Sequence, residues 1–376
     1  MTEPTYPAAR AVAPVVEAHF ARRVGRAKAV RPGASMEAPA AGAIEAIIDA
    51  AFWASLRREE GRTPRISLAL LPPDGAGHAL RFENRLPLDA AMLAKVAPAV
   101  ERPGIHLGVW DAGGGLHVWG TTRDVPPFCL VIEVVASGLL VVKHRSEPFG
   151  KFVNVAVLEG DQIKVVDERG GDIIPDCPSV VKSLIGSVER FTAGQHVNVL
   201  VQMATSMRAH GRGGALLVVP SDSDTWRESV VFPVLYALDP PFTELADLMG
   251  RELDESDWQE DVRHAIEAVA GLTAVDGATV VSDRYDVLAF GAKIARRRGH
   301  TPVEHVTVTE PIEGSTRTLA TPTQLGGTRH LSAAQFVHDQ RDATALVASQ
   351  DGRFTIFKWS PSEGYVHAHR VDALLL

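Results

Sequence analysis

Hydrophobic residues in the first 60 positions recur at helical spacing. Residues 9–29 and 40–58 are predicted to be helical, and in the second segment apolar side chains recur three and four positions apart and form one apolar stripe. The charged run from Arg57 to Glu60 ends the second pattern. We therefore predict two amphipathic helices, and we interpret the Ala- and Pro-rich stretch between them as a connector.

From residue 65 the pattern changes to short β-branched runs divided by Gly, Asp and Pro, with one helix predicted at about 87–100. This pattern is typical of antiparallel hairpins. The clearest turn, Asp111 to Gly115, places Trp110 and Trp119 on paired strands, where cross-strand packing is favoured over a ligand platform. Residues 1–175 are thus predicted to form an α+β domain with an antiparallel sheet, of unknown role. Its strands are RISLALL, ALRFEN, IHLGVWD, LHVWGTT, FCLVIEVVA, GLLVVKH, FVNVAVL and QIKVVD.

After Pro178 helices alternate with strands that look fully buried. Such alternation predicts an α/β domain with a mixed central sheet flanked by helices on both faces. We place the boundary near 175–190 and the second domain at 190–376. Helices are predicted at VNVLVQMATSMRAHG and at about 241–251, 258–271 and 329–338; strands are predicted at GALLVVP, TVVSD, DVLAFGAKI, EHVTVTE, ATALVAS and RFTIFKW.

The amino-acid composition limits which partners and which cellular compartment we expect for the protein. The 376 residues include 38 Lys and Arg against 46 Asp and Glu, a net charge of −8, which makes nucleic acid or an anionic membrane an unfavourable partner. Two cysteines cannot form a disulfide framework or a four-cysteine zinc site. No signal-peptide pattern and no long apolar run are present. We expect a cytoplasmic protein that does not enter a membrane.

Three segments of the second domain, 213–220, 273–294 and 326–357, each join a strand end to a turn of small residues. Ligands of open α/β sheets collect at strand ends, where glycine lets the backbone approach phosphate. Asp276 stands directly before such a turn and could hold a divalent metal. Thr328, Arg329 and His330 follow Gly327 at a predicted helix start, where N–H groups and a guanidinium favour an anion.

Each of these residues also has a purely structural interpretation. An Asp-Gly pair is most often a turn, and Thr328 or Ser332 could cap the helix. Arg329 alone could be a surface residue in a salt bridge.

The order of the motifs resembles the nucleotide-binding domain of bacterial diadenylate cyclases over roughly 190–360. In that family a strand like GALLVVP leads to a D-G-A motif, then to G-T-R-H-R, and then to D-A followed by V-V-S-E-E-x-G. Here the corresponding residues are Asp276-Gly277-Ala278, Gly327-Thr328-Arg329-His330, and Asp342-Ala343 followed by Val347-Ala348-Ser349-Gln350-Asp351-Gly352.

The resemblance implies an enzyme that condenses two ATP molecules to cyclic di-AMP with Mg²⁺ or Mn²⁺, in a face-to-face homo-oligomer where each domain holds one ATP. It makes Asp276 the metal ligand, which also helps to activate the attacking hydroxyl, and makes Arg329 and His330 catalytic with it. Nucleotide-binding positions would be Gly277, Ala278, Gly327, Thr328 and Ser349.

The chain departs from the family pattern in three places. Leu331 replaces the last Arg of R-H-R, and Ser349-Gln350-Asp351 replaces S-E-E. The connection 293–325 is longer and could be a lid; within it, Arg296 to Arg298 could replace the missing guanidinium or form a solvated loop. These departures support an alternative, a sensor domain of the same fold that binds nucleotide without turnover. A structural partner with a vestigial pocket is a third hypothesis.

One further pattern suggests a metal site. His367 and His369 share a face of a predicted strand, but no third ligand is near in sequence, so a half-exposed strand is favoured. The sequence contains no Walker-type phosphate loop, serine elbow or zinc-peptidase motif.

Overall fold

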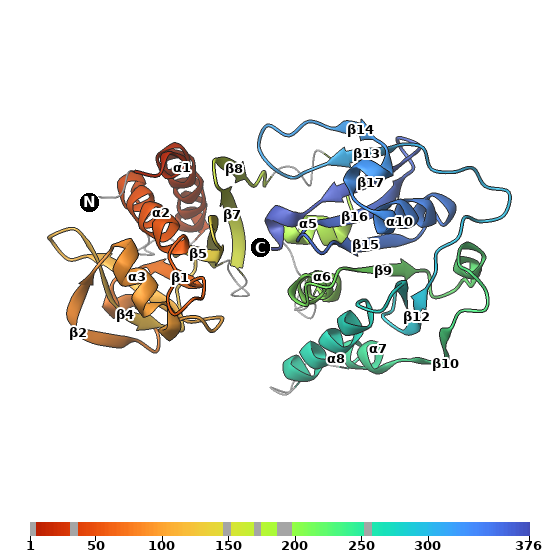
Figure 1. Ribbon diagram of the computed structural model, residues 1–376, viewed down its shortest axis with the longest axis horizontal. Helices are drawn as coiled ribbons and strands as arrows, with labels where there is room; N and C mark the ends of the chain where they lie inside the picture. Colours follow the sequence, from red (N-terminus) through yellow and green to blue (C-terminus); the bar gives the residue numbers. More distant parts are fainter. Residues whose placement is uncertain (1–4, 31–36, 146–151, 169–173, 186–197, 252–257) are drawn as a thin grey trace. The chain divides into compact units, whose positions relative to one another are not determined.

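The computed structural model describes residues 5–30, 37–145, 152–168, 174–185, 198–251 and 258–376. The chain divides into two compact units, Met1–Val166 with Leu376, and Asp167–Leu375 (Figure 1). The boundary therefore falls at Val166, before the expected 175–190, and part of that expected range lies outside the described residues.

The first unit contains three α-helices and an eight-stranded sheet among its described residues. The strand order is β2-β4-β3-β1-β5-β6-β7-β8. The helices are α1 (Pro7–Val30), α2 (Ala41–Ser55) and α3 (Ala90–Val96); the strands are β1 (Ile66–Leu70), β2 (Leu80–Pro87), β3 (His106–Asp111), β4 (Leu116–Thr122), β5 (Leu130–Ala136), β6 (Leu139–Arg145), β7 (Phe152–Glu159) and β8 (Gln162–Val165).

The prediction of a purely antiparallel first sheet is wrong at its centre. Strands β1 and β3 pair in parallel, with Leu68 opposite Leu107, while every other described pairing in this sheet is antiparallel. The reason is that β2 pairs with β4 at the sheet edge, and α3 then carries the chain back so that β3 runs in the direction of β1.

The two faces of the first sheet differ in chemistry. One face packs against α1 and α2 through a core that includes Phe20, Ile44 and Leu68. On the other face polar side chains occur beside apolar ones. There the Ser67 hydroxyl lies 2.7 Å from Nδ1 of His106, and Lys143 donates to Glu133. Also there, the Trp119 ring covers Gly108 so closely that a Cβ on this glycine would lie 2.1 Å from ring atoms.

The second unit is an α/β structure with a nine-stranded mixed sheet in the order β10-β12-β11-β9-β15-β16-β17-β13-β14, which confirms the predicted class. Its helices are α5 (Ser179–Ile185), α6 (Val199–Ala209), α7 (Glu244–Met249), α8 (Trp258–Leu272), α9 (Pro322–Leu325) and α10 (Thr328–Asp339); its strands are β9 (Gly214–Val219), β10 (Tyr236–Phe242), β11 (Ala278–Ser282), β12 (Val287–Ala292), β13 (Val306–Thr309), β14 (Thr318–Ala320), β15 (Thr344–Ala348), β16 (Phe354–Ser360) and β17 (Tyr365–Arg370).

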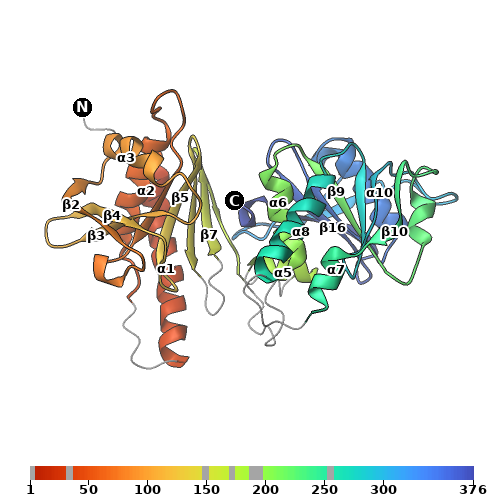
Figure 2. The ribbon, with the colours of Figure 1, turned by 90° about the horizontal axis from the view of Figure 1, so that it is seen from below.

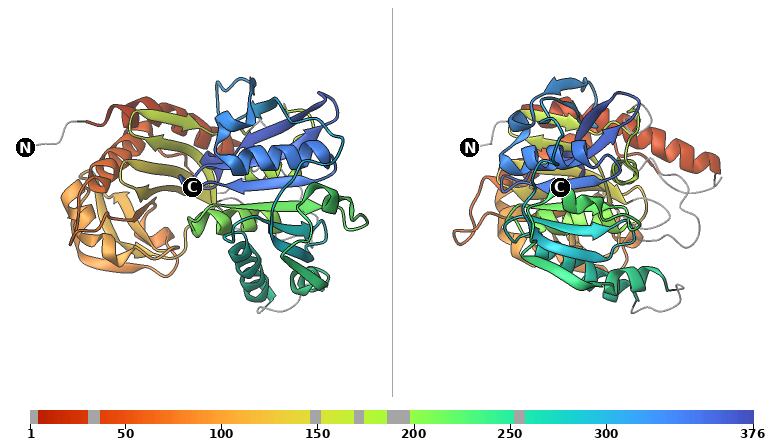
Figure 3. Two further views of the ribbon diagram at one scale, coloured as in Figure 1. Left: turned by 45° about the vertical axis from the view of Figure 1, so that its right-hand side comes forward. Right: turned by 90° about the vertical axis from the view of Figure 1, so that its right-hand side faces the viewer.

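Helices cover both faces of the second sheet. On one face α10 packs across β15, β16 and β17 (Figure 3). The Phe336 side chain of α10 is fully buried in the same core as Leu217 and Val347. On the other face α6 and α8 pack against each other and against the sheet (Figure 2). The interior is thus apolar above and below β9, as a strand buried on both faces requires.

The prediction of a half-exposed strand is wrong at His367 and His369, because both side chains are fully buried in β17. Nε2 of His367 lies 2.7 Å from Oε2 of Glu363, and Nδ1 of His369 lies 2.9 Å from the Thr309 hydroxyl. These two histidines are therefore interior hydrogen-bonding groups.

Candidate functional site

The candidate site lies at the edge of the second sheet where β9 and β11 begin. Asp276 precedes β11, and its carboxylate is 91% exposed. Nζ of Lys293, which follows β12, lies 2.5 Å from Oδ2 of Asp276. The hydrogen bond and charge of Lys293 hold the pKa of Asp276 below its usual value, and the charge of Arg329 acts in the same direction. Three charged groups thus meet at this edge.

Arg329 is positioned by a glycine that sequence reasoning missed. Nη1 of Arg329 lies 2.5 Å from where a Cβ on Gly213 would be, and Gln350 lies beside the same point. Gly213 also has a φ of +68°, which disfavours other residues. The guanidinium therefore rests over the turn that leads into β9, in space that only glycine leaves free.

The amino-terminal end of α10 has no side-chain cap. Gly327 is the N-cap residue and makes no side-chain hydrogen bond, and the first turn contains no acidic residue. The alternative that Thr328 or Ser332 caps this helix is thus wrong. Thr328 is exposed there. The His330 N–H donates to the Gly327 carbonyl at 3.1 Å. The helix dipole makes this uncapped end favourable for an anion, and Arg329 adds a full positive charge.

Gly277 and Ala278 have packing roles of their own. Gly277 has a φ of +126°, and a Cβ there would lie 2.4 Å from the carbonyl carbon of Gly291. Gly291 in turn lies against the Tyr236 ring, which stacks on Phe290. The Ala278 side chain is buried in the core beneath α10. Both residues fix the start of β11, so only their backbone could meet a ligand.

His330 does not share the surface with Arg329. Its side chain is buried, with the residue 2% exposed, and the ring meets the Phe357 ring edge to face. A Cβ on Gly326 would lie 2.4 Å from its Nδ1. Burial, the largest effect, lowers the pKa of His330. The structure thus shows His330 supporting the Gly326-Gly327 turn from inside, away from the predicted phosphate contacts.

Ser349 follows β15 in a tight turn. Its amide donates to the Arg353 carbonyl at 2.8 Å, and its hydroxyl hydrogen bond is the largest effect lowering the pKa of Asp351. Gln350, next in sequence, lies beside Gly213 and hence beside Arg329. The third predicted segment therefore reaches the same edge as the other two.

The missing guanidinium is not replaced by the basic run at 296–298. Leu331 is 37% exposed on α10. Arg297 lies at the opposite end of that helix, where its backbone N–H donates to Asp339 and its Nη2 lies 2.6 Å from Oε2 of Glu228. A helix of this length separates its two ends by about 16 Å, so Arg297 cannot serve the phosphate end.

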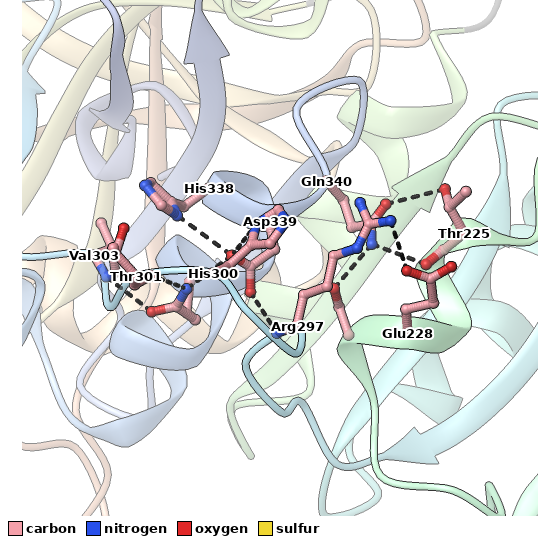
Figure 4. A network of polar contacts seen from close by, with 11 residues as sticks. Thr225, Glu228, Arg297, His300, Thr301, Val303, His338, Asp339 and Gln340 are labelled. Atoms are coloured by element: carbon pink, nitrogen blue, oxygen red, sulfur yellow. Dashed lines mark hydrogen bonds and ion pairs between the residues drawn. The ribbon is translucent and has the colours of Figure 1, made fainter.

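The connection expected to act as a lid is fastened to the carboxyl-terminal end of α10 (Figure 4). The buried carboxylate of Asp339 accepts from the Arg297 amide at 2.8 Å, and its Oδ1 lies 3.1 Å from Nδ1 of His300. Gln335 accepts from the Val303 amide and donates to the Thr301 carbonyl. These contacts hold residues 297–303 in place, which argues against a lid in this part.

The metal that the resemblance implies would have the Asp276 carboxylate as a ligand at this edge. Within the described ranges no group of three or more His, Cys, Asp or Glu side chains could hold a metal ion. Asp276 supplies one carboxylate, and Lys293 already occupies it. Mg²⁺ keeps several waters and is often held by one or two carboxylates plus substrate phosphates. The residues therefore fit a divalent ion only when it arrives with a nucleotide.

Comparisons with known proteins place a similarity in the first unit. A sequence model of the family described as "Probable sensor domain DACNV" matches residues 34–123. No curated protein matches the chain. A solved structure titled as a hypothetical membrane spanning protein from Bacillus cereus aligns with 50% of this chain and 70% of that chain, at 14% identity and a TM-score of 0.27, too low to carry an argument. Among the described residues, no helix is long and apolar enough to span a bilayer.

Proposed function

We propose that the second unit binds a nucleotide through its phosphates at the edge formed by β9, β11 and α10. The observation that carries this proposal is the convergence of Arg329 with an uncapped helix amino terminus, over a glycine that leaves room for the guanidinium. Two independent sources of positive potential thus meet at one point. The resemblance to diadenylate cyclases supports ATP as the ligand.

Each residue has a part in this proposal. Arg329 can bind phosphate oxygens in a bidentate manner, while the first N–H groups of α10 bind another oxygen. Gly213 keeps the guanidinium at the surface, and His330 holds the turn at Gly326 from below. Lys293 stands beside Asp276 and can move its ammonium group to a phosphate.

Diadenylate cyclase activity is one outcome that this site could support. The exposed carboxylate of Asp276 is available to the 3′-hydroxyl of a ribose once Lys293 turns to the phosphates. A divalent ion bound with ATP would neutralise charge on the transferring phosphoryl group. In the family that the chain resembles, two such domains face each other, so this candidate requires a homo-oligomer.

Nucleotide sensing without turnover is the second candidate. Leu331 removes a guanidinium from the motif, and Arg297 is held too far away to replace it. Lys293 neutralises the carboxylate that would bind the metal. The similarity of residues 34–123 to a probable sensor domain is in keeping with a sensory protein.

The binding proposal is tested by titrating ATP into the purified full chain in a calorimeter. Losing a charged hydrogen-bond donor should weaken binding by about 10- to 100-fold in Arg329→Gln. Arg263→Gln is the matched control, because Arg263 lies exposed on α8 and pairs with Glu260 and Glu267. If both variants bind ATP as the wild type does, the site is wrongly placed.

Turnover is tested by incubating the protein with ATP and Mg²⁺, then Mn²⁺, and measuring cyclic di-AMP by mass spectrometry. Product from the wild type and none from Asp276→Asn would establish the cyclase. ATP binding without product would establish the sensor. In that case Leu331→Arg should gain product if this one missing guanidinium is the cause.

The role of Lys293 is tested by comparing ATP binding with Mg²⁺ and with a chelator. With its ammonium group in place, we expect ATP to bind almost equally with Mg²⁺ or with a chelator. Lys293→Met should make binding depend on the divalent ion, because Asp276 would then repel the phosphates unless a metal bridges them. Equal metal dependence in both proteins would remove Lys293 from the site.

A further inference from the structure

The two units share one sheet topology, although nothing in the sequence patterns indicates a repeat. In the first unit the inner order is β2-β4-β3-β1-β5-β6-β7, and in the second it is β10-β12-β11-β9-β15-β16-β17. The pairing directions also match: β1 with β3 and β9 with β11 are parallel, and the five other pairs in each series are antiparallel.

The strand registers agree at several corresponding pairs of the two sheets. Val134 pairs with Leu140 across one hairpin, and Ala348 pairs with Phe354 across the other, so the same number of residues separates the two partners in each case. The first hairpin then continues through a register shift to Ala136 and Leu139, whereas the second closes through residues 349–353. Val134 and Ala348 also pair with the strands beside them, at Ile66 and Gly214 respectively. These pairings make Ile66 the counterpart of Gly214, and the parallel pairs then make His106 the counterpart of Ala278.

One large irregularity is common to the two sheets, although smaller register shifts within β5–β6 and β6–β7, and one of the two within β11–β12, are not shared. Between β2 and β4 the register advances from Arg81 to Leu86 on one strand and from Gly120 to Val118 on the other. Between β10 and β12 it advances from Ala237 to Phe242 and from Ala289 to Val287, which is the same jump. Each sheet also has an isolated bridge two residues after its corresponding strand, at Asp124 and at Ile294. Shared irregularities of this kind indicate two copies of one fold.

The copies differ in the connection that carries the phosphate-binding helix. Between β12 and β15 the second unit contains β13, β14, α9 and α10. The corresponding connection of the first unit, between β4 and β5, consists of residues 123–129, all of them described and none helical. The first unit thus has no counterpart of Thr328 or Arg329.

The remaining site positions are also unsuitable in the first unit. By the register, Arg65 stands where the second unit has Gly213, and Gly104 stands where it has Asp276. Val135 stands where it has Ser349. The carboxylate, the free space over the turn and the serine of the second unit are all missing at these positions.

We infer that the chain is a tandem pair of one fold in which only the second copy binds nucleotide, at one ATP per chain. This inference rests on the proposed function of the second unit. It assigns phosphate binding to the insertion between β12 and β15, and it gives the first copy, which contains the sensor-like segment, a role that does not use nucleotide phosphate.

The test is the binding stoichiometry of ATP on the full chain, measured by calorimetry and by equilibrium dialysis. We expect one site per chain, which Arg329→Gln weakens strongly. Gly213→Arg copies the first unit's residue into the second and should abolish binding, whereas the reverse change, Arg65→Gly, should leave it unchanged. Circular dichroism checks that Gly213→Arg folds. If Gly213→Arg does not fold, the loss of binding in Arg329→Gln still tests the inference.

The outcomes separate this inference from the proposed function. Two sites per chain would overturn the inference and leave the second unit a nucleotide-binding domain. A single site that survives Arg329→Gln and Gly213→Arg but is lost in Arg65→Gly would assign binding to the first copy, again against the inference. No ATP binding by the wild type would overturn the proposed function, and the inference would fall with it.

Discussion

The two units use the same strand order to different ends, and the difference lies on one face of the sheet. In the second unit α10 covers that face, and the residues beneath it, including Ala215, Val347 and Phe357, are apolar. At the corresponding positions the first unit has Ser67, Glu133 and Lys143. Gain or loss of one helix therefore changes both the chemistry of a sheet face and the ligands that its edge can bind.

Removing the Phe336 side chain should produce the largest effect, and only in the second unit. Phe336→Ala leaves a cavity under α10 and should lower the free energy of unfolding by about 3–5 kcal/mol. Hydrogen exchange should quicken in peptides from α10 and β15, and peptides from β1 and β5 should stay protected. Equal loss of protection in both units would show that the two do not unfold independently.

A single methyl group should distinguish the copies at one register position. Gly108 of the first sheet corresponds to Val280 of the second, and the Trp119 ring fills the space that a side chain would need. Gly108→Ala should therefore destabilise the first unit by about 2–3 kcal/mol through overpacking. Urea unfolding followed by tryptophan fluorescence measures this. A neutral result would mean that Trp119 can leave its place on the sheet at little cost.

Acid should weaken both units through buried histidines, among them His106 in the first unit and both His330 and His369 in the second. Burial, the largest effect, lowers the pKa of His106 to about 4 and that of His369 to about 3. An unfolded histidine binds a proton below about pH 6.5, so the contribution to stability is complete above that value and falls by up to about 1.4 kcal/mol per pH unit for each histidine down to its folded pKa.

The acid effect is measured by urea midpoints at pH 7 and pH 5. His106→Asn should reduce the pH dependence of the first unit, and His369→Asn should reduce that of the second, where His330 keeps its own contribution. Each variant is the control for the other unit. If neither variant alters the slope, other groups cause the acid sensitivity.

The smallest effect concerns exposed ion pairs. Lys293→Met removes the pair with Asp276 in the second unit, and Arg81→Met removes the pair with Asp74 in the first. Because solvent screens such pairs, we expect no measurable change in either thermal midpoint. A clear drop for Lys293→Met alone would show that this pair holds the start of β11 in place, in addition to its part in binding.

Much of the secondary structure could be predicted from the sequence, because buried helices and strands carry periodic apolar patterns. The parallel pairing of β1 with β3 could not, since a strand's own pattern does not name its partner. Strand β10 escaped prediction because it is largely exposed and contains Pro240 and Pro241, so it shows no alternation. The buried histidines of β17 look polar in sequence, although hydrogen bonds make them interior residues.

The candidate site was predictable where the signal is local. Asp276 and Arg329 lie at the same edge, as strand-end reasoning expects. Gly213 and Lys293 were missed because their importance comes from contacts with residues far away in sequence. The burial of His330 could have been predicted from helical spacing, because His330 shares a helical face with Ala333, Ala334 and Val337, which are buried.

The residues beneath α10 also bear on how the chain folds. Tandem copies of one topology risk exchanging equivalent hairpins as they form, a known route to misassembly in repeat proteins. The hairpin β5–β6 inserted into the second sheet would bury Glu133 and Lys143 against Phe336, at the cost of desolvating both charges. The charges on that face thus disfavour exchange of the two hairpins, because β5–β6 is stable only in the first sheet, where Glu133 and Lys143 pair with each other.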